Sequence, residues 1–191
     1  MLAARKAVDQ ELSKEKILET ARDLFVSEGY QHVTMRQIAK SLGYSHGALY
    51  YHFKNKAELF YSLVEKDFGL LNEKLDEFLK EDTDVETKLK RILLGYIEFG
   101  IRHPNHYQIM FLIQEDDRQS VLQREPNLTY EKFASALYTL CGNKVTPMVI
   151  WSLFLSLHGF VAHYCKHPEQ TFEDVKRMAE SHVQFLLKRL L

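Results

Sequence analysis

Two short segments with the apolar periodicity of helices meet at Gly43, and this junction constrains the fold more than any other part of the chain. Residues 34–42 place Ile38 and Leu42 on one side, which is the spacing of a helix face. Only Gly43 and Tyr44 separate this segment from residues 45–53. Glycine ends helices readily because it accepts the left-handed backbone conformation. The sequence therefore predicts two short helices joined by a tight turn, a helix-turn-helix.

A third helix is predicted just upstream, over Ser13–Glu28. Its apolar residues recur at three- and four-residue spacing, and Gly29 follows as a stop. The helix over residues 45–53 is too short to be stable alone. We therefore expect Leu49 and Phe53 to hold it by packing against the first helix.

The rest of the chain is poor in proline and glycine, and few stretches alternate as a half-buried strand would. Residues 114–127 are polar and include Pro126, which indicates a loop or an irregular helix end. We expect an all-α protein with a three-helix helix-turn-helix domain over residues 1–54 and a larger helical domain over residues 55–191. Further helices are predicted over Asn55–Lys80, Val85–Arg102, Pro104–Ile113, Leu128–Cys141, Pro147–Cys165 and Phe172–Leu190.

Composition limits the class of protein. The chain is 46% hydrophobic and 27% charged, which is typical of soluble globular proteins. It has no apolar run of about eighteen residues, so no spanning helix is expected, and its first residues lack the apolar centre of a signal peptide. We therefore expect a cytoplasmic protein. Cys141 and Cys165 are expected to be small buried residues rather than a disulfide, with a redox sensor as the alternative.

The formal net charge of −1 conceals an asymmetry between the two ends of the chain. Residues 1–60 hold nine Lys/Arg and seven Asp/Glu, a net charge of +2, whereas residues 61–191 have a net charge of −3. The sign of this difference suits a chain whose N-terminal helices contact nucleic acid and whose body does not.

A specific set of residues stands in and around the three N-terminal helices. It consists of Ile17, Ala21, Leu24, Phe25, Gly29, Thr34–Ala39, Leu42, Gly43, Gly47–Phe53 and Asn55–Leu59. These residues closely resemble the TetR-type (TetR/AcrR) transcriptional regulators. The resemblance implies a DNA-binding regulator, with repression expected. A weaker resemblance, in Tyr96–Phe99, His103–Pro104 and Trp151–Gly159, points to the Trp-His-Gly subtype of the C-terminal domain.

The start of the second short helix suits close approach to DNA. Side chains at the N-terminal end of a recognition helix reach base edges in the major groove. Ser45 and His46 stand at that end, and the small residues Gly47 and Ala48 follow. The glycine allows close backbone approach, and the alanine can touch a thymine methyl group. Tyr51 can offer its ring to a base or its hydroxyl to a phosphate.

The family resemblance divides these positions by role. Base contacts are implied for Arg36, His46, Gly47 and Tyr51. Phosphate contacts, which set register without reading sequence, are implied for Thr34, Tyr50, His52 and Lys56. Three alternatives stay open at this point: Tyr50 packed under the domain, His52 as a structural histidine, and Arg36 as a solvated helix charge.

The last two predicted helices favour a homodimer. Residues 147–165 are apolar nearly all round, so they must be buried on more than one side. Residues 172–190 carry a single apolar stripe. Two such helices from each copy would form a four-helix bundle, and the resemblance implies the same pairing. A homodimer reads a palindromic double-stranded DNA operator with half-sites about 34–36 Å apart, or a multiple of that.

The resemblance also implies a cavity in the larger domain for a small, mostly apolar effector that releases the DNA. Such pockets are apolar with a few polar groups, so the polar-tipped Tyr96, Tyr107, Trp151 and His158 are the main candidates. Each candidate can equally be a plain core residue. The candidate ligand residues are Tyr96, Phe99, Tyr107, Met110, Phe111, Trp151, Phe154 and His158.

Other functions find less support in the sequence. There is no phosphate-cradling glycine loop, nucleophile elbow or helical metal motif, so neither an enzyme nor a cofactor is expected. The pairs His103 and His106, and His163 and His167, keep a metal sensor open as a minor alternative. A helical interaction adaptor would leave the pattern over residues 36–56 without a purpose.

Overall fold

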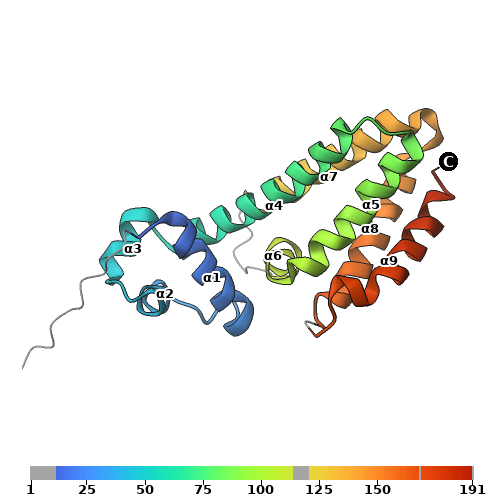
Figure 1. The fold of residues 1–191 in the computed structure, drawn as a ribbon. Helices are drawn as coiled ribbons and strands as arrows, with labels where there is room; N and C mark the ends of the chain where they lie inside the picture. Colours follow the sequence, from blue (N-terminus) through green and yellow to red (C-terminus); the bar gives the residue numbers. More distant parts are fainter. Residues whose placement is uncertain (1–11, 114–120, 168, 191) are drawn as a thin grey trace, which may run out of the picture.

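The computed structural model describes residues 12–113, 121–167 and 169–190, and every regular element within them is a helix (Figure 1). The predicted all-α fold is confirmed. The α-helices are α1 (Lys14–Glu28), α2 (Met35–Leu42), α3 (His46–His52), α4 (Lys56–Lys80), α5 (Val85–Arg102), α6 (Pro104–Tyr107), α7 (Val121–Cys141), α8 (Pro147–Tyr164) and α9 (Phe172–Leu187). A π-helical turn η1 (Gln108–Leu112) follows α6, and a 3₁₀ turn η2 (Gly142–Lys144) follows α7.

Local capping explains where the first helices begin and end. The Ser13 side chain accepts a hydrogen bond of 3.2 Å from the Lys16 amide at the start of α1. Thr34 and Gln37 form a capping box at the start of α2. Gly43 ends α2 with a φ of 76°, a left-handed conformation that glycine adopts without strain. The predicted helix-turn-helix is confirmed.

Helix α3 has seven residues and is held by tertiary contacts. Leu49 is fully buried and Phe53 nearly so, as predicted. Both belong to the core of the N-terminal lobe (α1 to α3), which also contains Ile17, Phe25 and Ile38. A helix of this length has too few internal hydrogen bonds to persist in water, so its orientation is set by these buried residues.

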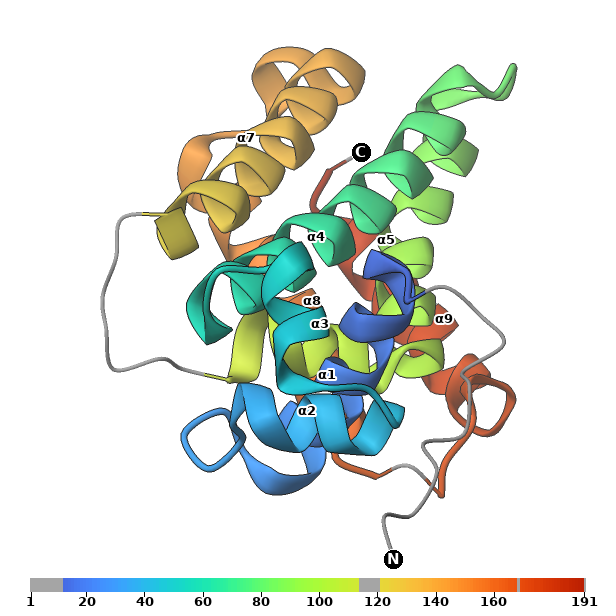
Figure 2. The ribbon, with the colours of Figure 1, turned by 90° about the vertical axis from the view of Figure 1, so that its left-hand side faces the viewer.

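Helix α4 connects the N-terminal lobe to the body, which comprises α5 to α9 (Figure 1). The lobe lies in front of the body when the molecule is viewed along α4 (Figure 2). The Phe60 ring of α4 lies 5.6 Å from the Phe25 ring and 4.8 Å from the Tyr30 ring. The first turns of α4 therefore pack in the lobe. The division into residues 1–54 and 55–191 falls at the start of a helix that belongs to both parts, and it stays a prediction.

A buried ion pair fastens α1 to α4. The Arg22 guanidinium donates to both carboxylate oxygens of Asp67, at 2.6 and 3.3 Å, and the two side chains are 6% and 0% exposed. The Nδ1 atom of His106, on α6, lies 3.0 Å from the same carboxylate. Asn105, also on α6, donates to Asp23 of α1 at 3.2 Å. Polar contacts therefore tie α1 to both α4 and α6.

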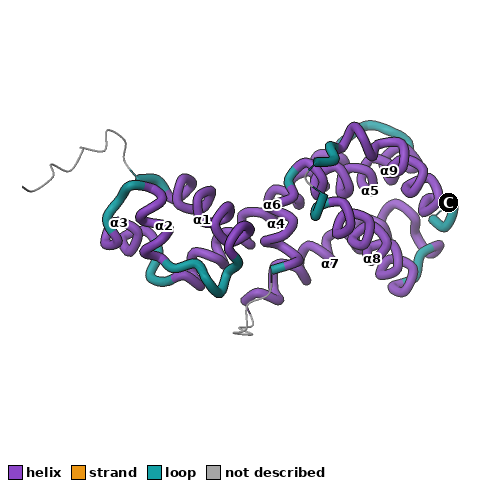
Figure 3. The backbone as a smooth tube through the Cα atoms, turned by 90° about the horizontal axis from the view of Figure 1, so that it is seen from below, coloured by secondary structure: helices purple, strands orange, loops and turns teal. Residues whose placement is uncertain are grey.

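Helix α5 is central to the body and packs against α4, α8 and α9 (Figures 1 and 3). Its close approach to α8 depends on Gly100. A Cβ atom at this position would lie 2.2 Å from a methyl carbon of Val161 and 3.0 Å from the Tyr107 ring. Only glycine therefore fits where these helices cross.

Two predicted elements differ from the structure. Residues 121–127 form the first turns of α7, so of the two expected alternatives, a loop or an irregular helix end, the loop is wrong for these residues. The predicted helix start at Leu128 is too late, and residues 114–120 lie outside the described residues. Pro126 sits in the second turn of α7, where proline removes one backbone hydrogen bond, and it packs in a cavity lining. The helix expected over residues 104–113 divides into α6 and η1, because the Ile113 amide bonds to the carbonyl of Gln108, five residues back.

Candidate nucleic-acid interface and ligand cavity

Helix α3 presents most of its polar side chains to solvent. Tyr51 is 88% exposed and Tyr50 is 45% exposed, while His46 and Gly47 are also exposed. A Cβ atom added at Gly47 would meet nothing within 4 Å. The packing of the free protein therefore does not require glycine at this position. Ala48 is half-buried and packs partly against the core.

An open groove brings together residues from three successive elements. Five of the predicted DNA contacts line it: Thr34, Arg36, His46, Tyr50 and Lys56. Gln31 and Asn55 also line the groove and were missed by the sequence reasoning. Gln31 lies outside the predicted helices and Asn55 at the very start of one, and only the fold brings them beside Arg36.

The exposure of two aromatic side chains bears on the alternatives for Tyr50 and His52, and it settles the one for Tyr50. Tyr50 is not packed under the domain, since its ring is half-exposed and meets the His46 ring edge-on at 4.7 Å. Its hydroxyl is therefore positioned to reach a partner outside the chain. His52 is half-buried and meets the Tyr51 ring at 5.4 Å, so a structural role stays open for this histidine. Ser45 and Arg36 are exposed.

Two of the predicted phosphate contacts are already engaged within the chain. The Nζ atom of Lys56 donates to the Tyr30 carbonyl at 2.7 Å and lies 4.1 Å from the centre of the Tyr30 ring. An ammonium has three donors, so Lys56 can hold this turn and still reach a phosphate. The Thr34 hydroxyl donates to the Gln37 side chain at 2.8 Å and accepts from the Gln37 amide. A phosphate contact from Thr34 would compete with that capping box.

The body contains a narrow cavity between α4, α5, α7, η1 and α8. Its empty space measures about 520 Å³, including the part open to solvent. Three of the predicted ligand residues line it: Tyr96, Phe111 and Phe154. Trp151 lies outside the lining, 44% exposed, with its ring stacked on Phe154 at 5.6 Å. Phe99 and Met110 are buried in the core outside this lining.

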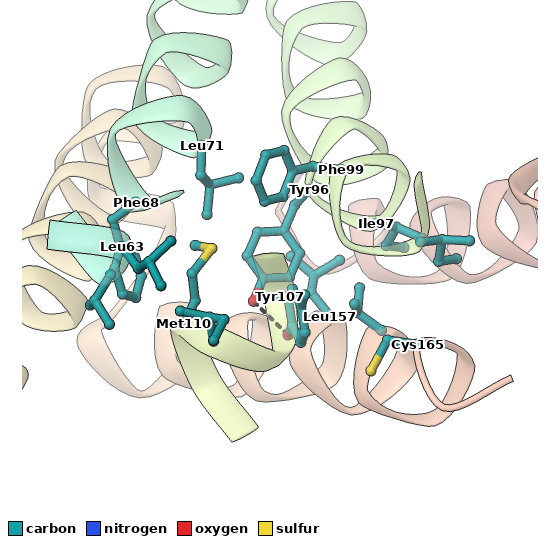
Figure 4. Close-up of a cluster of buried hydrophobic side chains, with 14 of the residues drawn as sticks. Leu63, Phe68, Leu71, Tyr96, Ile97, Phe99, Tyr107, Met110, Leu157 and Cys165 are labelled. Carbon is teal, nitrogen blue, oxygen red and sulfur yellow. Dashed lines mark hydrogen bonds between the residues drawn. The ribbon is translucent and has the colours of Figure 1, made fainter. Parts of the chain in front are cut away.

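The remaining polar candidates form a chain of hydrogen bonds among themselves. The hydroxyls of Tyr96 and Tyr107 are 3.0 Å apart (Figure 4), and the Tyr107 hydroxyl is 2.6 Å from Nδ1 of His158. Burial raises the pKa of both tyrosines and lowers the pKa of His158. Burial therefore favours a neutral imidazole, whose Nδ1 atom shares a hydrogen bond with the Tyr107 hydroxyl, and Tyr107 shares a second one with Tyr96. This chain is satisfied without a ligand.

The polar groups left in the cavity wall are ones the sequence reasoning missed. Asn72 of α4 donates from its side-chain nitrogen to the Thr129 hydroxyl of α7 at 3.0 Å, and both residues line the cavity. The Asn72 side-chain oxygen is buried and has no hydrogen-bond partner among the described residues. Asn72 precedes Glu73 and Lys74 in the sequence, which suggests a solvated face, and only the packing of α7 on α4 reveals its position.

Comparison with known proteins establishes the family. The model for bacterial regulatory proteins of the tetR family matches residues 17–63. The nucleoid occlusion factor SlmA of Salmonella typhi is 34% identical over 145 residues, which cover 74% of this chain and 72% of that protein. The chain belongs to the tetR family. The same factor from Citrobacter koseri is 33% identical over the same shares of the two chains.

Solved structures of other regulators share the whole fold of this tetR-family protein. MbdR from Azoarcus sp. CIB has a TM-score of 0.75 at 22% identity and covers 94% of this chain and 100% of its own. FadR from Bacillus subtilis, solved with stearoyl-CoA, has a TM-score of 0.73 at 19% identity over the same shares. At these identities the likeness shows the fold alone. The Trp-His-Gly subtype is not addressed by these comparisons and stays a prediction.

Family membership bears on the two candidate sites differently. All ten predicted DNA-contacting residues fall within the matched residues 17–63, and the protein is a DNA-binding transcription regulator of this family. The candidate ligand residues all lie outside that match. No helix in the described ranges is long and apolar enough to span a membrane. Nor do three metal-ligating side chains converge in those ranges, which include His103, His106, His163 and His167.

Proposed function

We propose that this tetR-family protein is a repressor that binds a palindromic operator as a homodimer and is released by a small, mostly apolar effector. The observation that carries the proposal is the groove formed by α2, α3 and the start of α4, where Arg36, His46, Tyr50 and Lys56 converge. Polar and cationic side chains on a short exposed helix suit readout of the major groove.

The roles of the interface residues follow from their exposure. His46, Gly47 and Tyr51 are exposed on α3 and are assigned to base edges, together with the exposed Arg36 of α2. Tyr50 and Lys56 are assigned to phosphates. The amide end of α4 adds to the second role, because a helix N-terminus attracts anions and Asn55 and Lys56 stand there. Exposed cations at Lys40 and Lys54 add sequence-independent attraction.

The homodimer is proposed through α8 and α9. Large apolar side chains remain exposed there in the single chain, among them Met148 (72%), Leu155 (47%) and Phe185 (62%). They follow one stripe on each helix and would be covered by the same stripe of a second copy. Exposed apolar patches of this kind mark interaction sites. A two-fold axis between the copies would present two recognition helices to a palindrome.

Helix α4 provides a physical route from the effector to DNA. Its first residue, Lys56, lines the interface groove. Further along the same helix, the cavity is lined by Phe68, Leu71, Asn72, Lys74, Leu75 and Phe78. A ligand that fits only one position of α4 would favour one spacing of the two recognition helices. The ligand and the operator would then lower each other's affinity by the same factor.

Selection of bound fragments from a random DNA pool tests the proposal. The expected result is a palindrome whose half-sites are about 34–36 Å apart or a multiple of that. Leu155→Glu places charges in the proposed dimer interface and should reduce operator affinity at concentrations where the variant is a monomer. Tyr51→Ala should reduce affinity while leaving the dimer intact. Enrichment of single, unpaired half-sites by the unaltered protein would refute the homodimeric mode of binding.

The similarity to SlmA supports a second candidate, a DNA-bound role at the nucleoid rather than at promoters. The 34% identity extends over 145 residues and so reaches beyond the DNA-binding match into the body. Chromosome-wide mapping of bound sites separates the two functions. Sites at one or a few promoters, together with altered transcription on deletion, support the repressor. Sites scattered over the chromosome without such a change support the nucleoid role.

A further inference from the structure

We propose that the body cavity binds an uncharged, largely apolar ligand carrying one hydrogen-bond donor that pairs with Asn72. The inference deepens the proposed function, on which its effector role rests, by naming the ligand's chemical class. Three features of the cavity carry it: the apolar wall, the unpaired amide oxygen, and the way in which nearby cations are already engaged.

The wall of the cavity is mainly aromatic. Phe68 and Phe78 come from α4, Phe111 from η1, Phe133 from α7 and Phe154 from α8. Phe111 meets the Phe68 ring edge-on at 5.1 Å, so these two lining rings pack against each other. Such a lining binds an apolar body, and a flat or chain-like one fits a narrow space better than a bulky one.

The unpaired oxygen of Asn72 defines the polar requirement. The Asn72 side-chain nitrogen is already bonded to Thr129, whereas its Oδ1 atom is shielded from water and has no hydrogen-bond partner in the described part of the chain. Buried polar groups are nearly always paired in folded proteins, so an orphan in the wall of a cavity marks where a ligand group belongs. An amide oxygen is an acceptor. The matching ligand group is therefore a donor such as a hydroxyl.

The cations near the cavity are committed to other carboxylates. Lys74 lines the cavity, but its ammonium is 2.7 Å from Glu77 and its side chain is 56% exposed. The Lys132 ammonium lies 2.7 Å from the Asp76 carboxylate and also donates to the main-chain carbonyl of Asn72 at 3.3 Å. An anionic head group buried beside Asn72 would thus meet an acceptor rather than a free cation, and an unpaired buried charge is strongly disfavoured. A carboxylate beside Asn72 is therefore disfavoured relative to a neutral donor.

The requirement differs from that expected for a long acyl thioester such as stearoyl-CoA, with which the B. subtilis FadR was solved. That ligand has no donor on its acyl chain and carries its charges at one end. An alkylphenol has the opposite pattern, with an apolar body and one neutral donor. The two classes can therefore be separated by binding measurements on matched small molecules.

Four probes with one apolar body provide the test: 4-butylphenol, butylbenzene, 4-butylanisole and 4-butylbenzoate. Binding to the full chain is measured by titration calorimetry at pH 7.5. The phenol should bind about tenfold more tightly than butylbenzene, the typical worth of one neutral hydrogen bond. The benzoate should bind at least tenfold more weakly than butylbenzene. Asn72→Leu should abolish the preference for phenol and leave butylbenzene affinity unchanged.

Thr129→Val is the second variant, since it keeps the shape of the wall and frees the Asn72 amide to turn. In this variant the ratio of phenol affinity to butylbenzene affinity should be smaller than in the unaltered chain but still above one. Circular dichroism verifies that both variants fold. The proposal is overturned if none of the probes binds, if the benzoate binds as tightly as the phenol, or if the anisole, which can only accept, equals the phenol. It is also overturned if folded Asn72→Leu retains the phenol preference.

Operator affinity measured in the same samples separates this inference from the proposed function. Phenol binding that depends on Asn72 but leaves operator affinity unchanged supports the ligand class and refutes the effector role. Release of operator by an anionic compound, with no Asn72-dependent phenol binding, refutes the ligand class and supports the effector role. The two failures therefore give different results.

Discussion

The buried ion pair between Arg22 and Asp67 gives the sharpest energetic prediction. The Asp67 carboxylate is fully buried and accepts two hydrogen bonds from Arg22 and a contact from His106. In Asp67→Leu the guanidinium would stay buried without a partner. Removing one member of a buried ion pair typically costs about 3–5 kcal/mol. For a chain of this size, about 2–4 °C per kcal/mol gives a loss of roughly 6–20 °C in Tm.

The double variant Arg22→Met, Asp67→Leu distinguishes this mechanism from a general intolerance of the site. Replacing a whole buried pair by apolar residues is often neutral or stabilising, so the double variant should be more stable than Asp67→Leu alone. Glu77→Gln is the matched control, because Lys74 and Glu77 are 56% and 61% exposed and an exposed pair is worth about 1 kcal/mol or less.

Urea unfolding followed by circular dichroism measures these differences. All variants must be compared at one protein concentration, because the stability of a dimer depends on it, and with similar m values, because the lobe and the body could unfold separately. A loss below about 1 kcal/mol in Asp67→Leu would refute the reasoning from burial. So would a double variant no more stable than the single one.

Three further predictions concern the interface, the dimer and pH. Lys56→Ala should weaken binding to all DNA sequences and flatten the salt dependence by about one counterion, whereas the exposed Lys66→Ala on the same helix should not; an unchanged slope in titrations across salt would contradict the phosphate role. Phe185→Glu should shift the protein from dimer to monomer in sedimentation velocity, and an intact dimer would place the interface elsewhere. Burial lowers the pKa of His158 in the folded state, so the unfolded chain binds more protons and stability should fall as pH drops below about 6.5. His158→Gln should lose less stability than the unaltered chain between pH 7.5 and 5.5 in urea unfolding, and an equal loss would assign the effect to other groups.

The parts of the fold that were predictable from the sequence are those fixed by local chemistry. Gly43 must adopt a left-handed conformation to end α2, and Thr34 and Gln37 satisfy the first amides of the same helix within one turn. The ends of α5 were also predicted, since Asp84 caps its start and proline follows its end. None of these features depends on a distant part of the chain.

The features that were missed depend on distant residues. Arg22 and Asp67 are 45 positions apart, and nothing in either helix pattern marks them as buried. Asn72 becomes a cavity residue only because α7 packs on α4. Pro126 suggested a loop because proline usually interrupts helices, yet it lies within α7 and in the cavity wall. The sequence named the polar tips of Tyr96 and Tyr107 as ligand candidates, but only the fold shows that they bond to each other.

The ion pair between Arg22 and Asp67 holds α4 at one point, and a tilt of the helix about that point would displace its first residue, Lys56. From Asp67 back to Lys56 is about three turns, or roughly 16 Å at 1.5 Å per residue. A tilt of about 5° around the clamped carboxylate would move the DNA-facing end by about 1.4 Å over that length. Opposite displacements in two copies would change the separation of the recognition helices by about 3 Å, which is close to the roughly 3.4 Å between successive nucleotides of one DNA strand. In the proposed homodimer, a small rearrangement of aromatic rings around a ligand would therefore shift the two recognition helices relative to the DNA by about one base step.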